Sequence, residues 1–434
     1  MKMKRYSLVF LFLLLVSMFA VFRMMENRLL VPKEDETEKK AIELEIWYPW
    51  TGRNELYEAA FMEAVEEYNE KHSDILLVPY GMEMELYREK LPADIASNET
   101  PDIYYCFTGG YMEQIIQSGR ILRLDDYLPE ASADWEWKNR LSEMIFDENI
   151  YGLGFAKTVG VFLINEEIFE KYQIAVPETC EQLMEVCQLF LNYGITPLAC
   201  SEDNDVGFRM YLEALCMYSA GADEYLDILT GKGEISDAFM RGVKQFVELL
   251  DMGAFGRVPV EKNTYDVEES FYMSRIPMYY TKNSFVGTIL QRKSPLYGKI
   301  RAIPFPGADK RTLTGGVCDC FVVNAQTRYP KQSTQALWEV VLGFSERLHA
   351  SGAGISIWEE NGEIPERILQ DGEGSRVYLD MTGLLRNAER FVPFWEFAVD
   401  RKQRKQYLEI SRELFEQEID TEEFERRLRS SLRS

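Results

Sequence analysis

Histidine is nearly missing from this sequence, and so are the short motifs that mark common enzymes. The 434 residues contain only His72 and His349. Neither has a neighbour at the spacing of a catalytic triad or a metal pair, so we expect both at the surface. Gly-x-Ser-x-Gly, P-loop and Cys-x-x-Cys patterns are also absent. The sequence therefore predicts no catalytic residue, no metal site and no cofactor.

Cysteine is sparse, and none occurs before Cys106. A processed N-terminal cysteine that carries a lipid is therefore not expected. The total is seven, so at least one thiol is unpaired. Cys318 and Cys320 would face opposite sides of a strand, and Cys180 and Cys187 would lie roughly 10 Å apart along a helix, so neither pair should form a disulfide. We expect mostly free, buried thiols.

Basic residues are fewer than acidic residues in this chain. The chain has 72 acidic and 48 basic residues and a net charge of −24, which disfavours binding to the phosphates of nucleic acid. Its composition, 46% hydrophobic and 28% charged, is that of a globular protein, and its length allows two or three domains.

The N-terminus carries a targeting segment. Lys2, Lys4 and Arg5 precede an uncharged apolar run from Ser7 to Phe22, which is the order of a signal peptide or of a membrane anchor. A large residue, Met18, stands where a cleavage site needs a small one, which favours an uncleaved anchor over 1–25. Residues 26–40 are polar and charged and predict a flexible tether. With or without cleavage, the rest of the chain would lie outside the cytoplasm.

From Ala41 onward, apolar runs typical of strands alternate with stripes at helical spacing. This alternation predicts an α/β fold with mainly parallel sheets covered by helices. More than one hydrophobic core is expected, so we predict two lobes with a cleft between them. Strands are expected at 44–48, 75–80, 103–107, 159–164, 278–280 and 321–323, and helical stripes at 57–68, 183–191, 239–250 and 337–344.

Aromatic and small polar residues gather at predicted strand ends. Trp47, Tyr48 and Trp50 precede Thr51-Gly52, and Phe107 precedes Thr108-Gly109-Gly110. Aromatic faces cover the C–H faces of sugar rings, while polar side chains bond the hydroxyls. The pattern indicates a pocket for a sugar, although most such aromatics would be expected in the core.

These segments resemble extracellular solute-binding protein family 1, the binding proteins of carbohydrate-uptake ABC importers, which include maltose-binding protein. The similarity runs from about Leu44 to the C-terminal helix. It lies in the order and spacing of seven stretches: 44–72 (LEIWYPWTGRNELYEAAFMEAVEEYNEKH), 100–130, 150–174, 176–200, 229–255, 271–287 (FYMSRIPMYYTKNSFVG) and 315–324 (GGVCDCFVVN).

The resemblance implies a two-lobed type II periplasmic-binding-protein-like fold with a hinged cleft. Lobe 1 would comprise 41–150 and about 312–355, and lobe 2 would comprise 151–311 and about 356–434. Phe285 stands where many members have tryptophan, so one stacking surface would be smaller or lost. Carried over by position, the ligand-binding residues would be Trp50, Arg53, Asn54, Phe107, Tyr111, Lys157, Thr158, Phe208, Asn283, Phe285, Asp319 and Trp395.

The expected function is capture of a sugar or oligosaccharide for an ABC importer, without catalysis. The implied partners are a small-molecule ligand, ABC permease subunits and, through the N-terminal segment, the membrane; we expect a monomer. Two alternatives stay open: a membrane-tethered sensor for a signalling receptor, and a secreted glycan hydrolase, which would need two carboxylates about 5–10 Å apart. Arg53 and Lys157 near the predicted cleft would allow an acidic sugar.

Overall fold

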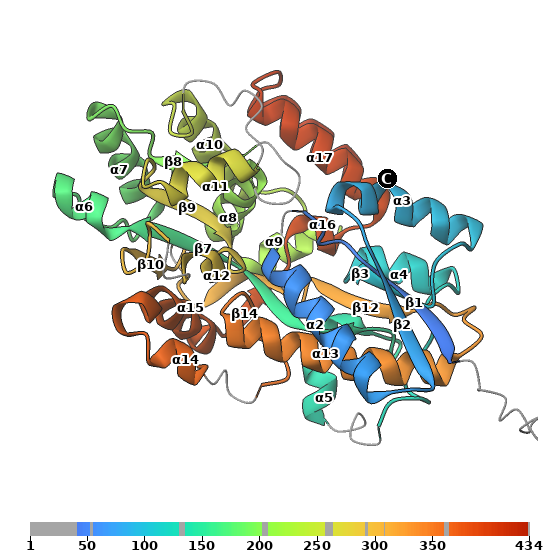
Figure 1. Cartoon of the computed structure of the whole chain (residues 1–434). Helices are drawn as coiled ribbons and strands as arrows, with labels where there is room; N and C mark the ends of the chain where they lie inside the picture. The colour runs from blue at the N-terminus through green and yellow to red at the C-terminus, as the bar shows by residue number, and fades with distance from the viewer. Residues whose placement is uncertain are drawn as a thin grey trace, which may run out of the picture.

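The structure, a computed structural model, describes residues 41–52, 55–129, 135–201, 207–256, 264–290, 294–307, 309–359 and 364–432. The predicted anchor and tether lie outside these residues. Within the described ranges, no helix is both long enough and apolar enough to cross a membrane. Figure 1 shows helices and strands alternating along the chain and gathering around two sheets.

The first lobe is built on a five-stranded sheet in the order β2-β1-β3-β12-β6. The first three of these strands run parallel, and β12 lies antiparallel between β3 and β6. The elements of this lobe are β1 (Ile42–Tyr48), α2 (Glu55–Lys71), β2 (Ile75–Gly81), α3 (Met84–Ser97), β3 (Ile103–Phe107), α4 (Gly110–Gln117), α5 (Trp135–Arg140), η2 (Ser142–Met144), β4 (Ile145–Phe146), β5 (Asn149–Ile150), β6 (Leu153–Gly154), β12 (Asp319–Val323) and α13 (Pro330–Ser351).

Apolar periodicity explains how this lobe packs. In β1, Leu44 and Ile46 are fully buried while the alternating Glu43 and Glu45 are exposed, as the period of a strand requires. Helix α2 buries its predicted stripe, including Phe61, against the sheet and α13. Figure 1 shows α2 and α13 lying side by side over one face of this sheet.

The second lobe is built around the long strand β7 (Ala156–Asn165). Its main sheet has the order β14-β11-β7-β9-β8, and β10 and β13 also pair with β7. Every partner of β7 runs antiparallel to it, whereas β14 pairs with β11 and β8 with β9 in parallel. This sheet is therefore mixed, and the expectation of mainly parallel sheets is wrong here. The other strands are β8 (Leu198–Ala199), β9 (Met278–Lys282), β10 (Ile300–Ile303), β11 (Thr312–Gly316), β13 (Ile355–Ser356) and β14 (Arg390–Val392).

Helices cover this second sheet, and two of them contain the stripes predicted at 183–191 and 239–250. The amphipathic helix α10, for example, buries Phe239, Val243 and Phe246. The helices of the lobe are α6 (Glu166–Tyr172), α7 (Cys180–Asn192), α8 (Phe208–Ala220), α9 (Ala222–Leu229), α10 (Asp237–Asp251), α11 (Thr264–Tyr272), α12 (Phe285–Ile289), α14 (Glu366–Leu369), η4 (Gly372–Ser375), α15 (Arg376–Asn387), α16 (Trp395–Ala398), α17 (Arg401–Phe415) and α18 (Thr421–Leu432).

The chain passes between the two sheets three times: from β6 to β7, from β11 to β12, and from α13 to β13. The lobes also meet where α16 packs against α4. A β-carbon on Gly109 would overlap the carbonyl oxygen of Phe397, and one on Gly110 would lie 2.9 Å from that of Val399. Two glycines at the start of α4 therefore allow the backbone of the C-terminal segment to approach the first lobe closely.

His349 departs from the surface position expected of it. It lies in the last turn of α13, is buried, and has Nδ1 3.4 Å from the Tyr378 hydroxyl of α15. The packing of α15 over the end of α13 removes this face from solvent. His72 is partly exposed beside Glu339, and all seven cysteines are buried.

Candidate functional site

A cavity of about 260 Å3 lies between the two lobes. It opens at the carboxyl ends of β1, β3 and β9, where open α/β sheets bind ligands. Its first-lobe wall contains Pro49, Trp50, Thr51, Tyr57, Glu83, Met84, Glu85, Arg88, Tyr105, Phe107 and Asp319. Its second-lobe wall contains Thr158, Thr264, Glu268, Lys282, Ser284, Phe285, Thr288 and Phe397.

Aromatic rings form much of the wall, but they differ in how much ring they leave for a ligand. Trp50 is packed among core rings, with centroids 5.0 Å from Phe344 and 5.5 Å from Tyr105. Its faces therefore belong mainly to the core. Phe107 lies at the seam, 5.7 Å from Phe397 of the other lobe. These two rings form a joint apolar surface that exists only while the lobes are together.

Asp319 is the polar centre of the first-lobe wall. It begins β12 directly opposite Phe107 of β3. Its carboxylate accepts hydrogen bonds from the Tyr105 hydroxyl and, at 3.4 Å, from the Thr158 hydroxyl of the second lobe. Burial raises the pKa of Asp319, and nearby Lys282 opposes that rise. The carboxyl thus links the two lobes at the floor of the cavity.

Charged groups complete the lining. The Arg88 guanidinium lies 4.8 Å from the centroid of the Phe107 ring, and its Nη1 is 3.6 Å from Oε2 of Glu396 in the second lobe. On the opposite wall, burial raises the pKa of Glu268 to about 7. The cavity therefore combines ring faces with acceptors and donors, as binding sites for polar small molecules do.

Five of the residues predicted to bind ligand line this cavity together: Trp50, Phe107, Thr158, Phe285 and Asp319. Tyr111 lies in an adjoining space of about 60 Å3, with its ring 5.7 Å from Phe107. Arg53 and Asn54 lie outside the described residues.

The other four predicted residues do not line the cavity. The Lys157 ammonium lies 4.7 Å from the centroid of the Phe391 ring. The Asn283 side chain donates to the carbonyl of Lys157 and accepts from the Val159 amide, both at 3.0 Å, and so fastens β7 to the turn after β9.

Phe208 and Trp395 are packed inside the second lobe. Phe208 stacks on Phe415 with centroids 4.2 Å apart, and Trp395 stacks on Tyr407 at 4.4 Å. Both aromatic residues are almost completely buried. Their positions explain packing between α8, α16 and α17.

The sequence reasoning missed Arg88, Glu268, Lys282 and Phe397. Lys282 had a signal, because it ends β9 immediately before the Asn283-Ser284-Phe285 turn. Arg88 and Glu268 lie within helices whose sequences do not distinguish them from other charged positions. Phe397 reaches the cavity only through the packing of α16 on the first lobe.

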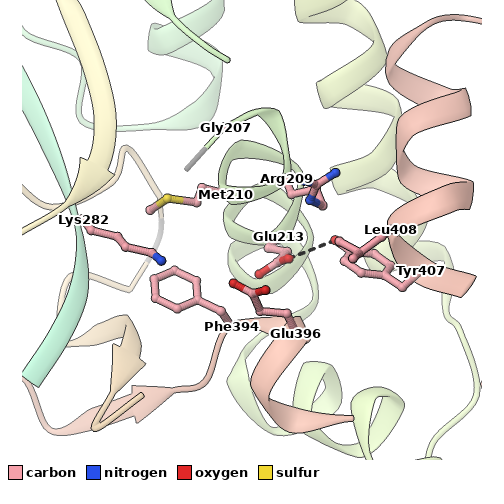
Figure 2. Close-up of a pocket in the computed structure, with 9 residues that line it drawn as sticks. All are labelled: Gly207, Arg209, Met210, Glu213, Lys282, Phe394, Glu396, Tyr407 and Leu408. Carbon is pink, nitrogen blue, oxygen red and sulfur yellow. Dashed lines mark hydrogen bonds between the residues drawn. The ribbon is translucent and has the colours of Figure 1, made fainter. Parts of the chain in front are cut away.

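A second, much smaller pocket lies beside the cavity and shares Lys282 with it. Its volume is about 20 Å3, enough for roughly one water molecule. Figure 2 shows the Glu213 and Glu396 carboxylates converging there, with the Lys282 ammonium directed toward the side of Phe394 and Glu396.

Glu213 accepts hydrogen bonds from the Tyr407 hydroxyl at 3.1 Å and from the Trp395 amide at 3.0 Å. Burial nevertheless raises its pKa to about 7. Glu396 pairs with Arg404 at 2.8 Å as well as with Arg88. The two carboxylates of this pocket are thus already paired with other groups of the protein.

The described ranges contain no group of three or more His, Cys, Asp or Glu side chains able to hold a metal ion. Neither histidine lines the cavity. The arrangement is suited to binding through ring contacts, hydrogen bonds and charge.

Comparison with solved structures supports the two-lobed architecture. A structure described for xylan utilization by the thermophilic bacterium Caldanaerobius polysaccharolyticus matches with a TM-score of 0.82 and 23% identity, covering 90% of this chain and 99% of the other. A chitin oligosaccharide binding protein matches with a TM-score of 0.81 and 18% identity, over 91% and 98%. RafE in complex with raffinose matches with a TM-score of 0.71 and 14% identity, covering 90% of this chain and 99% of the other.

At the level of sequence, no curated protein matches significantly. The family model for the bacterial extracellular solute-binding protein, however, matches residues 54–341, which is well over half of the chain. That range includes strands of both sheets and most of the cavity wall. Fold, cavity and sequence match agree that this chain is a member of the bacterial extracellular solute-binding protein family.

Proposed function

We propose that this protein captures a sugar or oligosaccharide outside the cytoplasm and delivers it to an ABC importer. The observation that carries this proposal is the cavity between the lobes, where aromatic rings and hydrogen-bonding groups of both lobes face the same space. Structural relatives described as a chitin oligosaccharide binding protein, or as complexes with raffinose and cycloalternan, add support for a carbohydrate ligand.

Binding would use the two kinds of surface that a sugar presents. Phe107, Phe285 and Phe397 supply apolar ring surface for the C–H faces. Asp319, Lys282 and Thr158 supply acceptors and donors for hydroxyl groups. Because these residues come from both lobes, a ligand that contacts them all would favour the closed arrangement over an open one.

The delivery step would depend on this closed arrangement. Permease subunits would recognise the surface formed when the lobes are together, and the segment at 1–25 would keep the protein at the outer face of the membrane, with 26–40 as a tether. The protein would act as a monomer and leave its ligand chemically unchanged.

Isothermal titration of the purified soluble part, 41–434, against a broad panel of mono- and oligosaccharides tests the proposal. We expect saturable heat with at least one carbohydrate, and loss of that heat in Asp319→Ala with the melting temperature unchanged within a few degrees. A folded protein that binds no carbohydrate of the panel would contradict the proposed function.

A further inference from the structure

The ligand cavity has an unequal charge lining. Four carboxyl groups face it, from Glu83, Glu85, Glu268 and Asp319, against two cations, Arg88 and Lys282. The number of charged groups alone does not determine the charge that a ligand would meet, because paired charges cancel. The partners of each charged group determine which sign a ligand would meet.

Both cations already have carboxylates close by. Arg88 lies 3.6 Å from Glu396, which Arg404 also contacts. Lys282 is close enough to Asp319 to oppose the rise in its pKa, and Figure 2 shows its ammonium ending beside the ring of Phe394. An anionic ligand would therefore have to compete with the protein's own carboxylates for these two cations.

Two of the carboxyl groups have no such compensation from the residues that the structure describes. Within the part of the chain that the structure describes, no lysine or arginine nitrogen lies within 4 Å of a carboxyl oxygen of Glu83 or Glu268. Glu268 is set in the second-lobe wall, where burial holds its pKa far above the usual range of a glutamate. A half-buried carboxylate without a cation is less favourable than one in water, and a positively charged ligand group would relieve that cost.

The aromatic part of the wall suits a cation as well. Tyr57, Phe107, Phe285 and Phe397 line the same space as Glu268. The negative faces of aromatic rings attract ammonium groups, and the attraction grows where water is displaced. Carboxylate and ring faces together favour an amine-bearing ligand over a neutral or acidic one of the same size.

We infer that the cavity selects an amino sugar whose protonated amine is bound beside Glu268, with Glu83 contributing at the first-lobe wall. This inference rests on the proposed function, because it names the class of sugar that the same cavity takes. It differs from the expectation that Arg53 and Lys157 would allow an acidic sugar: Lys157 does not line the cavity, and Arg53 lies outside the described residues.

The test is titration calorimetry at pH 7 with probes that differ in one group: glucose, N-acetylglucosamine, glucosamine and glucuronate, with the β-1,4-linked dimers of the first three. We expect glucosamine or its dimer to bind roughly tenfold to a hundredfold more tightly than the neutral counterparts, the range of a hydrogen bond to a charged group. Glucuronate should bind most weakly.

Two variants locate the effect. Glu268→Gln should abolish the preference for the amine while changing the affinity for neutral sugars less than about threefold. Glu83→Gln, at an exposed position before α3, should reduce the preference in part and is not expected to disturb folding. Glu269→Gln is the matched control, because Glu269 is exposed on the same helix and does not line the cavity.

The outcomes separate the inference from the proposed function. Equal or tighter binding of the neutral or acidic probes would overturn the inference and leave the proposed function intact. Absence of heat with glucosamine and its dimer would also overturn it, whatever the wider carbohydrate panel shows. An amine preference that survives in both Glu268→Gln and Glu83→Gln would contradict the assigned position of the amine.

Discussion

The two neighbouring pockets contain the same kinds of charged side chain but differ in the partners that these side chains have within the protein. In the small pocket of Figure 2, Glu396 has Arg88 and Arg404, and Glu213 has two hydrogen-bond donors. In the larger cavity, Glu268 has no cation within the described residues. The first group of charges holds the protein together, whereas the second is left for a ligand to complete.

The contact between the start of α4 and α16, which carries Glu396 of the small pocket, should be sensitive to substitution. Gly109 and Gly119 have nearly equal φ values, +67° and +69°, but only Gly109 faces another backbone, that of Phe397. Gly119→Ala should cost about 1 kcal/mol for its left-handed conformation. Gly109→Ala should cost at least about 3 kcal/mol, because the α16 contact must also shift.

Chemical denaturation of the two glycine variants, together with titration of the best-binding sugar, provides the measurement. Affinity should fall in Gly109→Ala and stay unchanged in Gly119→Ala. Equal effects of the two substitutions would show that the α4–α16 contact does not matter for closure.

The buried carboxyl of Glu213 should make stability depend on pH. Its pKa rises from an ordinary 4.5 to about 7 on folding, so the folded state binds the proton more tightly than the unfolded state does. Below pH 4.5 the carboxyl is protonated in both states and does not lower the free energy of unfolding. As the pH rises toward 7, the free energy of unfolding falls by about 3 kcal/mol for a shift of this size.

Glu213→Gln should reduce the pH dependence of the melting temperature between pH 5 and 8 and leave the part that Glu268 contributes, whose pKa is also raised to about 7. Glu185→Gln, an exposed position on α7, is the control and should leave the pH profile unchanged. A wild-type profile that is flat over this range would contradict the assignment.

Loss of the ion pair between Arg88 and Glu396, which joins the lobes, should lower the free energy of unfolding by a smaller but measurable amount. Arg88→Met removes the Glu396 contact, and Arg404 still compensates the buried carboxylate. We expect a loss of about 2 kcal/mol, less than for a buried pair with no second cation. Lys299→Met, which removes an exposed contact to Glu167, should leave the free energy of unfolding unchanged within error.

The smallest effect on binding is expected from Phe208, which separates core packing from ligand contact. Phe208→Leu should lower stability by about 1 kcal/mol, because it loses the stack on Phe415. Sugar affinity should stay the same within twofold, as measured by titration. A large loss of sugar affinity with an unchanged free energy of unfolding would show that Phe208 contacts the ligand.

Sequence periodicity predicted most of the framework. The alternation in 44–48 and the stripe at 57–68 correspond to β1 and α2, because each pattern has one buried face. The second sheet was predicted less well. Antiparallel pairing around β7 depends on where distant strands meet, and the apolar runs of β7 and β9 are the same for either direction.

The cavity was predictable only where its residues follow strands. Phe107 ends β3, so the general rule for α/β sheets places it near a ligand. Asp319 begins β12 and reaches the same edge only because β12 runs antiparallel to β3. Trp395, in contrast, looks like a ligand-stacking residue in the sequence but is covered by Tyr407. Phe397, two residues later, reaches the cavity because α16 turns it toward Phe107, which no local pattern indicates.

The order in which strands enter the first sheet has a consequence for biogenesis. β12 lies between β3 and β6, and its Asp319 bonds Tyr105, 214 residues earlier in the chain. The first half of the protein must therefore leave the ribosome before this inner strand of its sheet has been synthesised. Such delayed pairing between segments far apart in the sequence favours slow folding of the first lobe.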